Sequence, residues 1–120
     1  MIAIDVDIAR NRLVLTLKGR PSNAQFEQAR AQVTQAITRL KPPFDLLSDV
    51  SELESLEQIE SPQLSAVVAL VLSGGVRRTV RVVGKSARGA LQMERIARSL
   101  NHHAYLAFSL DEAEQVFAQR

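Results

Sequence analysis

The sequence predicts an α/β fold in which strands and helices alternate along almost the whole chain. Three observations lead to this prediction. The chain has 120 residues, of which 46% are hydrophobic, and no break in composition marks a linker, so we expect one domain over residues 1–120. Apolar residues recur with a period of two in some segments and with a helical period in others. From Arg78 to Gln119, strand-like and helix-like segments follow one another with almost nothing between them.

The first two segments are expected to form a β-hairpin. Ile2, Ile4 and Val6 alternate with small or acidic residues, and residues 13–18 alternate in a similar way. The polar stretch 9–12 lies between the two segments. A period of two on both sides of a short polar link is typical of two antiparallel strands. A third strand is predicted from Phe44 to Val50.

Four helices are predicted from their ends and their apolar stripes. Ser22 and Gln25 have the spacing of a capping box, and the helix that they begin stops before Pro42-Pro43. A second helix is expected to begin at Ser61-Pro62 and to end at Gly74-Gly75. The third follows a strand over residues 79–83, and a capping box of Ser109 and Glu112 begins the fourth. The segment from Ser51 to Glu60 is either a loop with apolar anchors or a short helix.

The predicted element order is therefore ββαβαβαβα, with about five strands in the sheet. Strands separated by a single helix run parallel and are joined by right-handed crossovers. The central strands are not continuous apolar runs, because Arg81 lies between two valines and Asp45 between Phe44 and Leu46. We therefore expect a mostly parallel, singly wound sheet with its helices mainly on one face and the other face partly wet.

Composition excludes several classes of protein. The chain has no cysteine, which excludes disulfides, thiolate zinc sites and cysteine nucleophiles. No apolar run approaches the ~20 residues that cross a bilayer, and the N-terminus does not resemble a signal peptide, so we expect a cytoplasmic protein without membrane insertion. Aromatic residues make up only 4% of the chain and do not interleave with its basic residues, which argues against nucleic-acid binding.

Charge is unevenly distributed although the net charge is only +2. One segment is acidic and holds Asp45, Asp49, Glu52, Glu54, Glu57 and Glu60 without a basic residue. A later segment is basic and holds Arg77, Arg78, Arg81, Lys85, Arg88, Arg95 and Arg98 against Glu94 alone. Each segment is either a solvated surface or a polar docking face.

Residues suited to catalysis or metal binding do not form a recognised pattern. Gly84-Lys85-Ser86 resembles the end of a phosphate-binding loop, but Thr79 stands where the first glycine is needed. Lys85, Ser86 and Arg88 at the start of the third helix could still hold an anion. His102 and His103 are adjacent, so their side chains diverge, and no third metal ligand has a matching spacing. Asp49, Ser51 and a histidine lack a nucleophile elbow, so we expect no enzyme, no cofactor and no metal.

Several short motifs resemble the STAS domain, the family of bacterial anti-sigma factor antagonists and of the cytoplasmic tails of sulfate transporters. The motifs are Leu15-Thr16-Leu17-Lys18-Gly19 before a helix, Asp45-Leu46-Leu47-Ser48-Asp49-Val50-Ser51 entering a helix, Val82-Val83-Gly84, and Ser109-Leu110-Asp111-Glu112-Ala113. The resemblance covers nearly the whole chain in element order. It implies a right-handed strand–helix superhelix that acts in signal transduction by binding another protein, such as a kinase or an anti-sigma-like regulator.

One motif departs from the family pattern. Antagonists of this family carry Asp-Ser-Ser-Gly at the start of the second helix and are phosphorylated on its serine, whereas this chain has Glu60-Ser61-Pro62-Gln63. Ser61 is therefore either a phosphorylation site or a plain helix cap. We expect the partner to dock on Glu54, Glu57, Glu60, Ser61 and Gln63. The alternative function is a binding module for an anionic small molecule, nucleotide or lipid at Lys85, Ser86 and Arg88.

Overall fold

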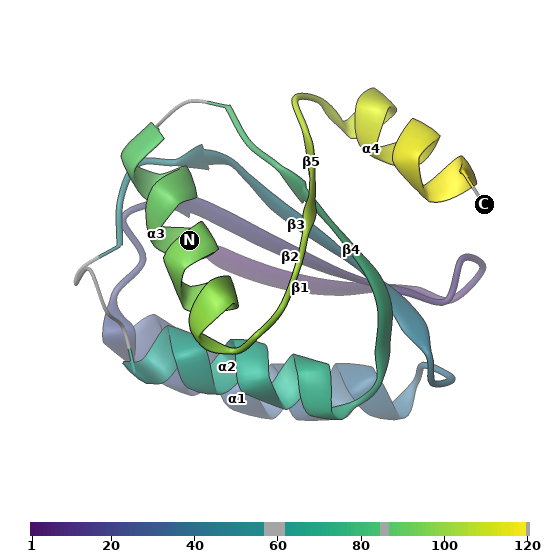
Figure 1. Cartoon of the computed structure of the whole chain (residues 1–120). Coiled ribbons are helices and arrows are strands. Elements are labelled where there is room, and N and C mark those ends of the chain that lie inside the picture. The colour runs from purple at the N-terminus through teal and green to yellow at the C-terminus, as the bar shows by residue number, and fades with distance from the viewer. Residues whose placement is uncertain (57–61, 85–86, 120) are drawn as a thin grey trace.

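The structure is a computed structural model that describes residues 1–56, 62–84 and 87–119. Its elements follow the predicted order (Figure 1). They are β1 (Ile2–Asp7), β2 (Arg12–Gly19), α1 (Asn23–Thr38), β3 (Phe44–Leu53), α2 (Pro62–Ser73), β4 (Val76–Val82), α3 (Ala87–Ser99), β5 (Tyr105–Ala107) and α4 (Leu110–Ala118).

The strands form one sheet in the order β1-β2-β3-β4-β5. The pair β1–β2 is antiparallel, with Ile4 opposite Leu15, and all the other neighbouring pairs are parallel. The predicted hairpin and parallel sheet are therefore confirmed. Because each strand pairs with the strand that precedes it in sequence, β1 and β5 are the two edges of the sheet.

Two strands are longer than the sequence predicted. The segment from Ser51 to Leu53, expected to be loop or helix, continues β3, because Lys18 and Gly19 of β2 remain in register with Glu52 and Leu53. Strand β4 begins at Val76 rather than at residue 79, because Val76 pairs with Phe44. Residues 57–60 of the ambiguous segment lie outside the described residues.

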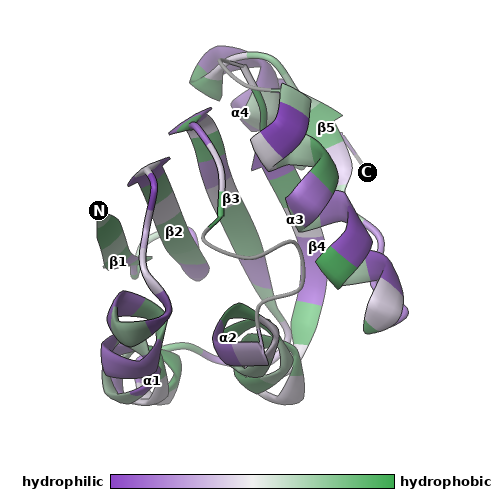
Figure 2. Ribbon diagram, turned by 90° about the vertical axis from the view of Figure 1, so that its left-hand side faces the viewer, coloured by the Kyte–Doolittle hydropathy of each residue, from purple (hydrophilic) through white to green (hydrophobic). Residues whose placement is uncertain are grey.

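Helices α1, α2 and α3 lie on one face of the sheet (Figures 1 and 2). The main core lies between these helices and the strands, and Phe26, Leu53, Leu64 and Val71 are among its residues. A second, smaller core lies on the opposite face. Its residues are Leu47, Val80, Val82 and Ala107 of the strands and Ala113 and Phe117 of α4. The expectation of helices mainly on one face is thus confirmed.

The helix ends show why the chain turns where it does. The Ser22 side chain accepts a hydrogen bond from the Gln25 backbone N–H, and the Gln25 side chain accepts one from the Ser22 backbone N–H, which confirms the capping box. The Ser109 side chain accepts from the Glu112 N–H in the same way. After α2, Gly75 has φ = +96°, a conformation that side-chain-bearing residues rarely adopt.

The two charged strand residues do not lie where they were expected. Arg81 and Asp45 were predicted to mark a wet face, but both are buried. Arg81 lies on the face that the helices cover, where its Nη1 donates to Glu94 Oε2 of α3 at 2.8 Å. Asp45 is bound by Arg77 through two hydrogen bonds of 3.1 and 2.8 Å. Both are buried because each has an oppositely charged partner, which alternation along a strand does not reveal.

Candidate functional site

The predicted docking residues that the structure describes, Glu54 and Gln63, lie at the edge where the parallel strands end. Strands β2 and β3 end side by side at Gly19 and Leu53, and α2 and α3 begin near this edge at Pro62 and Ala87. In open α/β sheets, ligands bind at the carboxyl ends of the strands. This edge is therefore the first place to look for a functional surface.

Exposed acidic side chains line the part of this edge that the structure describes. Glu52 lies 3.0 Å from Lys18 and Glu54 lies 3.4 Å from Arg20, measured between the charged atoms. All four side chains are about half exposed or more, so these pairs are screened by solvent and are easily exchanged for a partner's charges. Glu57, Glu60 and Ser61 lie outside the described residues.

The acidic segment does not form one continuous surface. Asp45 lies at the opposite end of β3 and is neutralised by Arg77, so it does not belong to the docking edge. Asp49 is half-buried, and its Oδ1 accepts hydrogen bonds from the Ser51 backbone N–H at 3.0 Å and from its hydroxyl at 2.7 Å. The exposed part therefore begins at Glu52.

Gln92 of α3 holds the chain that follows Glu54. Its Oε1 accepts a hydrogen bond of 2.9 Å from the Leu56 backbone N–H, and its side chain is buried. Gly89, one turn earlier, lets α3 approach β3 closely, because a Cβ there would lie 3.1 Å from the Leu53 carbonyl oxygen. Sequence reasoning missed this role. The signal was a glutamine four residues before Ile96, next to the apolar stripe of Met93, Ile96 and Ala97.

Gln63, another predicted docking residue, lies in the first turn of α2 and is half-buried. Its Oε1 is buried without a hydrogen-bond partner among the described residues. Most buried acceptors in proteins have a partner, so this oxygen is an exception within the part of the chain that the structure describes.

The predicted anion site is only partly described. Lys85 and Ser86 lie outside the described residues, whereas Arg88 is exposed in the first turn of α3. Arg88 and Arg95 flank a shallow hollow of about 350 Å³ that is also lined by Leu91 and Gln92. The structure thus adds Arg95 to the predicted set, because it lies about two turns after Arg88 on the same side of α3.

The basic segment, like the acidic one, is divided by the fold. Arg77 binds Asp45 and Arg81 binds Glu94. Arg78 donates to the carbonyl oxygens of Phe117 and Gln119, both at 2.6 Å, so it satisfies the free end of α4. The exposed arginines that remain on one element are Arg88, Arg95 and Arg98 of α3.

The two histidines diverge, as their adjacency predicted. The Nε2 of His102 lies 2.7 Å from the Thr79 hydroxyl, whereas the His103 ring packs edge-on against Tyr105 with centroids 5.2 Å apart. Burial, together with the charge of Arg81 and with His103, lowers the pKa of His102. Among the described residues, no hydrogen bond joins His102 or His103 to Asp49 or Ser51: His102 is hydrogen-bonded to Thr79, and Asp49 to Ser51. Residues 1–56, 62–84 and 87–119 contain no group of three His, Asp or Glu side chains that could hold a metal ion.

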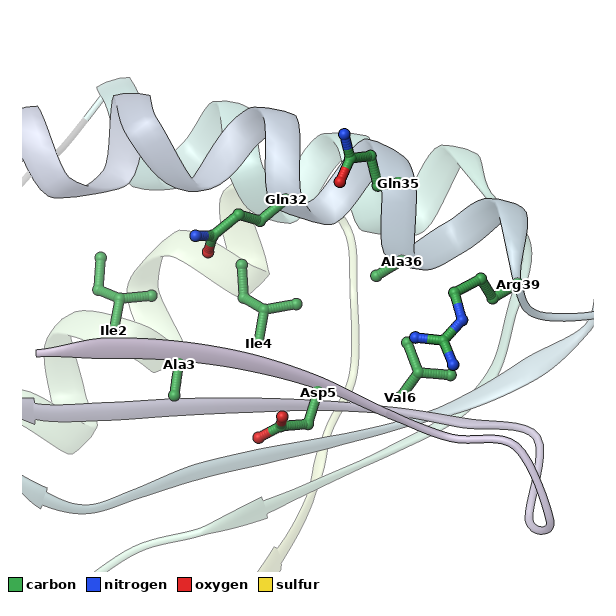
Figure 3. A pocket seen from close by; sticks show the side chains of 9 residues that line it. All are labelled: Ile2, Ala3, Ile4, Asp5, Val6, Gln32, Gln35, Ala36 and Arg39. Atoms are coloured by element: carbon green, nitrogen blue, oxygen red, sulfur yellow. The ribbon is translucent and has the colours of Figure 1, made fainter.

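A groove of about 580 Å³ runs between β1 and α1 (Figure 3). Ile2, Ile4 and Val6 point from β1 toward the helix, and Gln32 and Arg39 lie across from them. Ala3 and Asp5 point to the other side of the strand. The groove walls are mainly aliphatic groups and amides together with the Arg39 guanidinium, and these lining residues form no cluster suited to catalysis.

Comparison with known proteins identifies the fold. No family model matches the chain, and no curated protein matches its sequence. Among solved structures, the chain matches the anti-sigma factor antagonist SpoIIAA in its unphosphorylated form, with a TM-score of 0.64 and 14% sequence identity over 99% of this chain and 100% of that one. The chain has the fold of an anti-sigma factor antagonist. The fold implied by the STAS resemblance is therefore confirmed.

At 14% identity the likeness establishes the fold alone and assigns no role to the site residues. In the described part of the chain, no helix has the length and apolar character that a membrane crossing requires.

Proposed function

We propose that this protein is a non-catalytic regulatory module that binds another protein, such as a kinase or an anti-sigma-like regulator. The observation that carries the proposal is the full-length likeness to SpoIIAA, whose name describes an antagonist of an anti-sigma factor. Under this proposal the partner docks on what we call the acidic edge: Glu52, Glu54 and the chain that follows them to Gln63.

The geometry of the acidic edge suits a docking role. Glu52 and Glu54 are exposed, and their pairs with Lys18 and Arg20 are screened by solvent, so the two carboxylates can attract a basic partner over a distance. The Gln92–Leu56 hydrogen bond places the start of the following segment, which lowers the entropic cost of binding. Exposed carboxylates can increase the rate of association with a basic partner, and an anchored segment beside them needs less ordering when the partner binds.

The test compares charge reversals at two places. Glu52→Lys with Glu54→Lys should slow association with the partner captured from cells that make the protein, and should flatten its salt dependence. Glu27→Lys with Glu112→Lys is a control with the same change in net charge at two exposed helix positions outside the acidic edge, and Glu27 also pairs with an arginine, Arg30 at 3.1 Å. On-rates for the two variants that are equal to each other and to that of the unmodified protein would remove the acidic edge from consideration.

A second function, binding of an anionic small molecule, nucleotide or lipid, is favoured by one observation. Arg88 and Arg95 flank the same hollow and have no ion-pair partner within the described residues. Ligand binding to the native state raises its thermal stability by mass action. Under the regulatory proposal we expect no stabilisation by a panel of phosphate-bearing compounds. A shift that Lys85→Glu with Arg88→Glu abolishes would favour the second function instead.

A further inference from the structure

A groove with an apolar floor lies between α3 and the edge strand β5. We call it the α3–β5 groove. It has a volume of about 470 Å³ and is lined by Leu91, Glu94 and Arg98 of α3, by Leu106 of β5, and by His103 and Ala104 before that strand. Leu91 is 69% exposed and Leu106 is 54% exposed. Two large aliphatic side chains therefore face solvent across one hollow.

Most of the large exposed apolar residues lie on α3 or along β5 and the chain that follows it, and two of them, Leu91 and Leu106, line this groove. Of the seven large hydrophobic residues that are exposed in the described part of the chain, Leu91, Tyr105, Leu106, Phe108 and Leu110 lie on α3, on β5 or between β5 and the first residue of α4. Single exposed apolar residues are normal on a protein surface, whereas a cluster of them marks an interaction site.

The backbone of β5 also has a free side. Strand β5 pairs with β4 alone, and the Ala107 carbonyl accepts a hydrogen bond of 2.9 Å from the Val83 N–H. Successive residues of a strand direct their backbone groups to opposite sides, so those of Leu106 point away from β4. Such an edge is a template for another strand.

The charges around the groove are mostly positive. Arg98 lines the groove, and Arg88 and Arg95 lie on the same exposed stripe of α3 and line the neighbouring hollow, which shares Leu91 with it. Glu94 contributes the carboxylate at this site, and it is shared between Arg81 at 2.8 Å and Arg98 at 3.4 Å. A second copy of the chain docked symmetrically in this groove would bring its own arginines against these, so charge argues for an acidic occupant.

We propose that the α3–β5 groove binds an extended acidic segment of a partner protein, which adds a strand to the β5 edge. Backbone hydrogen bonds to Leu106 supply part of the affinity. The side chains of the segment that point to the α3 face include an apolar one that packs between Leu91 and Leu106 and, two residues along, an acidic one that faces Arg98 and Arg95. This surface differs from the acidic edge in its residues and in the sign of its charge, so it is a second docking site beyond the proposed function.

The test uses a fluorescein-labelled peptide of about ten residues in which every second residue is threonine and the residues between are valine and glutamate in turn, so that valine and glutamate share one face. This length covers an edge strand with both flanks. Fluorescence anisotropy should show binding, and the same peptide with lysine for glutamate should not bind. Leu91→Glu with Leu106→Glu should weaken binding by about tenfold or more, because it removes the apolar floor and repels the acidic side chains. The amide resonance of Leu106 should shift when the unmodified protein binds the peptide.

The matched control carries Ile8→Glu and Gln115→Glu, two exposed positions elsewhere that add the same charge. It should bind the peptide as the unmodified protein does, and circular dichroism should show that both variants fold. The proposal is overturned if the glutamate peptide does not bind, or if the groove variant binds it normally. It is also overturned if the groove instead mediates self-association in sedimentation experiments or takes up a single-stranded oligonucleotide. Glu52→Lys with Glu54→Lys should leave peptide binding intact, which separates this test from that of the proposed function.

Discussion

Arg81 shows how a charged residue can lie in the middle of a parallel sheet. It is buried beneath α3, and its Nη1 donates to Glu94 Oε2, whereas its Nε has no hydrogen-bond partner among the described residues. Its neighbours in the same small cavity include Ser48, Thr79 and His102. A buried polar cluster of this kind constrains which helix can pack on which strands, because Glu94 must lie opposite Arg81.

Removing one partner of this pair should cost more than removing both. Glu94→Ala leaves the buried Arg81 without a carboxylate and should lower the free energy of unfolding by about 1–3 kcal/mol, a range below that of a fully buried pair because Glu94 is partly exposed. Adding Arg81→Met should restore part of this loss. Urea unfolding of the two variants measures the difference. If the double variant were less stable than Glu94→Ala alone, the pair would not be acting as a buried charge and its counter-charge.

His102 should make stability depend on pH. Burial, the charge of Arg81, and His103 lower the pKa of His102 in the folded protein. The unfolded chain takes up a proton on this ring near pH 6.5, whereas the folded protein does so only at lower pH. Stability should therefore fall as the pH is lowered from about 6.5 toward the folded-state pKa. Thermal unfolding of His102→Gln should lack this part of the decline, and His103→Gln should retain it.

Substitutions at Ser61 distinguish a helix N-cap from a phosphorylation site. As an N-cap, Ser61→Ala should lose about 1 kcal/mol of stability, and Ser61→Asp should be neutral or stabilising because it keeps an acceptor and adds negative charge at the helix start. As a phosphorylation site, Ser61→Asp should in addition repel the partner, and Ser61→Ala should bind nearly as well as serine. We expect the cap behaviour. Phosphate on Ser61 in protein from its own cells, or loss of partner binding by Ser61→Asp alone, would contradict this expectation.

At the scale of elements, the helices are attached to the sheet by polar contacts as well as by apolar faces. Gln92 ties α3 to the chain after β3, and Arg78 ties β4 to the last carbonyls of α4. Arg12 of β2 also pairs with Glu114 of α4, and its guanidinium lies 3.9 Å from the centre of the Phe117 ring. These contacts specify which end of each helix lies over which strand, a choice that hydrophobic packing leaves open.

Loss of the Gln92 side-chain acceptor should loosen the acidic edge. Gln92→Leu leaves the Leu56 N–H buried without its partner, which should cost about 1–3 kcal/mol of stability and weaken partner binding further than the folded fraction explains. Gln115→Leu, at an exposed position of α4, is the matched control and should change neither quantity. Denaturant unfolding and partner titration measure the two effects. Unchanged partner affinity in folded Gln92→Leu would show that the segment does not depend on this contact.

At the scale of the whole molecule, the element order and strand directions follow from periodicity, capping boxes and the short connections. The burial and pairing of the charged residues do not follow from these patterns, because they depend on partners far apart in sequence. Asp45 and Arg77, or Arg78 and the end of α4, meet only after β3, β4 and α4 are assembled. The same holds for the α3–β5 groove. Leu91 and Leu106 look like ordinary apolar positions in sequence, and only the packed molecule shows that they remain uncovered.

The small core beneath α4 has a consequence for how the molecule opens. Strand β5 has three residues and pairs with β4 alone. The small core holds β5 and α4 on the sheet, and Arg12 and Arg78 make polar contacts with α4. We therefore expect the β5–α4 unit to open while the main core stays closed, so that its amides exchange with heavy water through a partial opening of lower free energy than those of β2 and β3. A segment bound along β5 would therefore slow amide exchange in α4 as well as in β5. Slower exchange in α4 would report binding at the β5 edge, although the bound segment does not touch that helix.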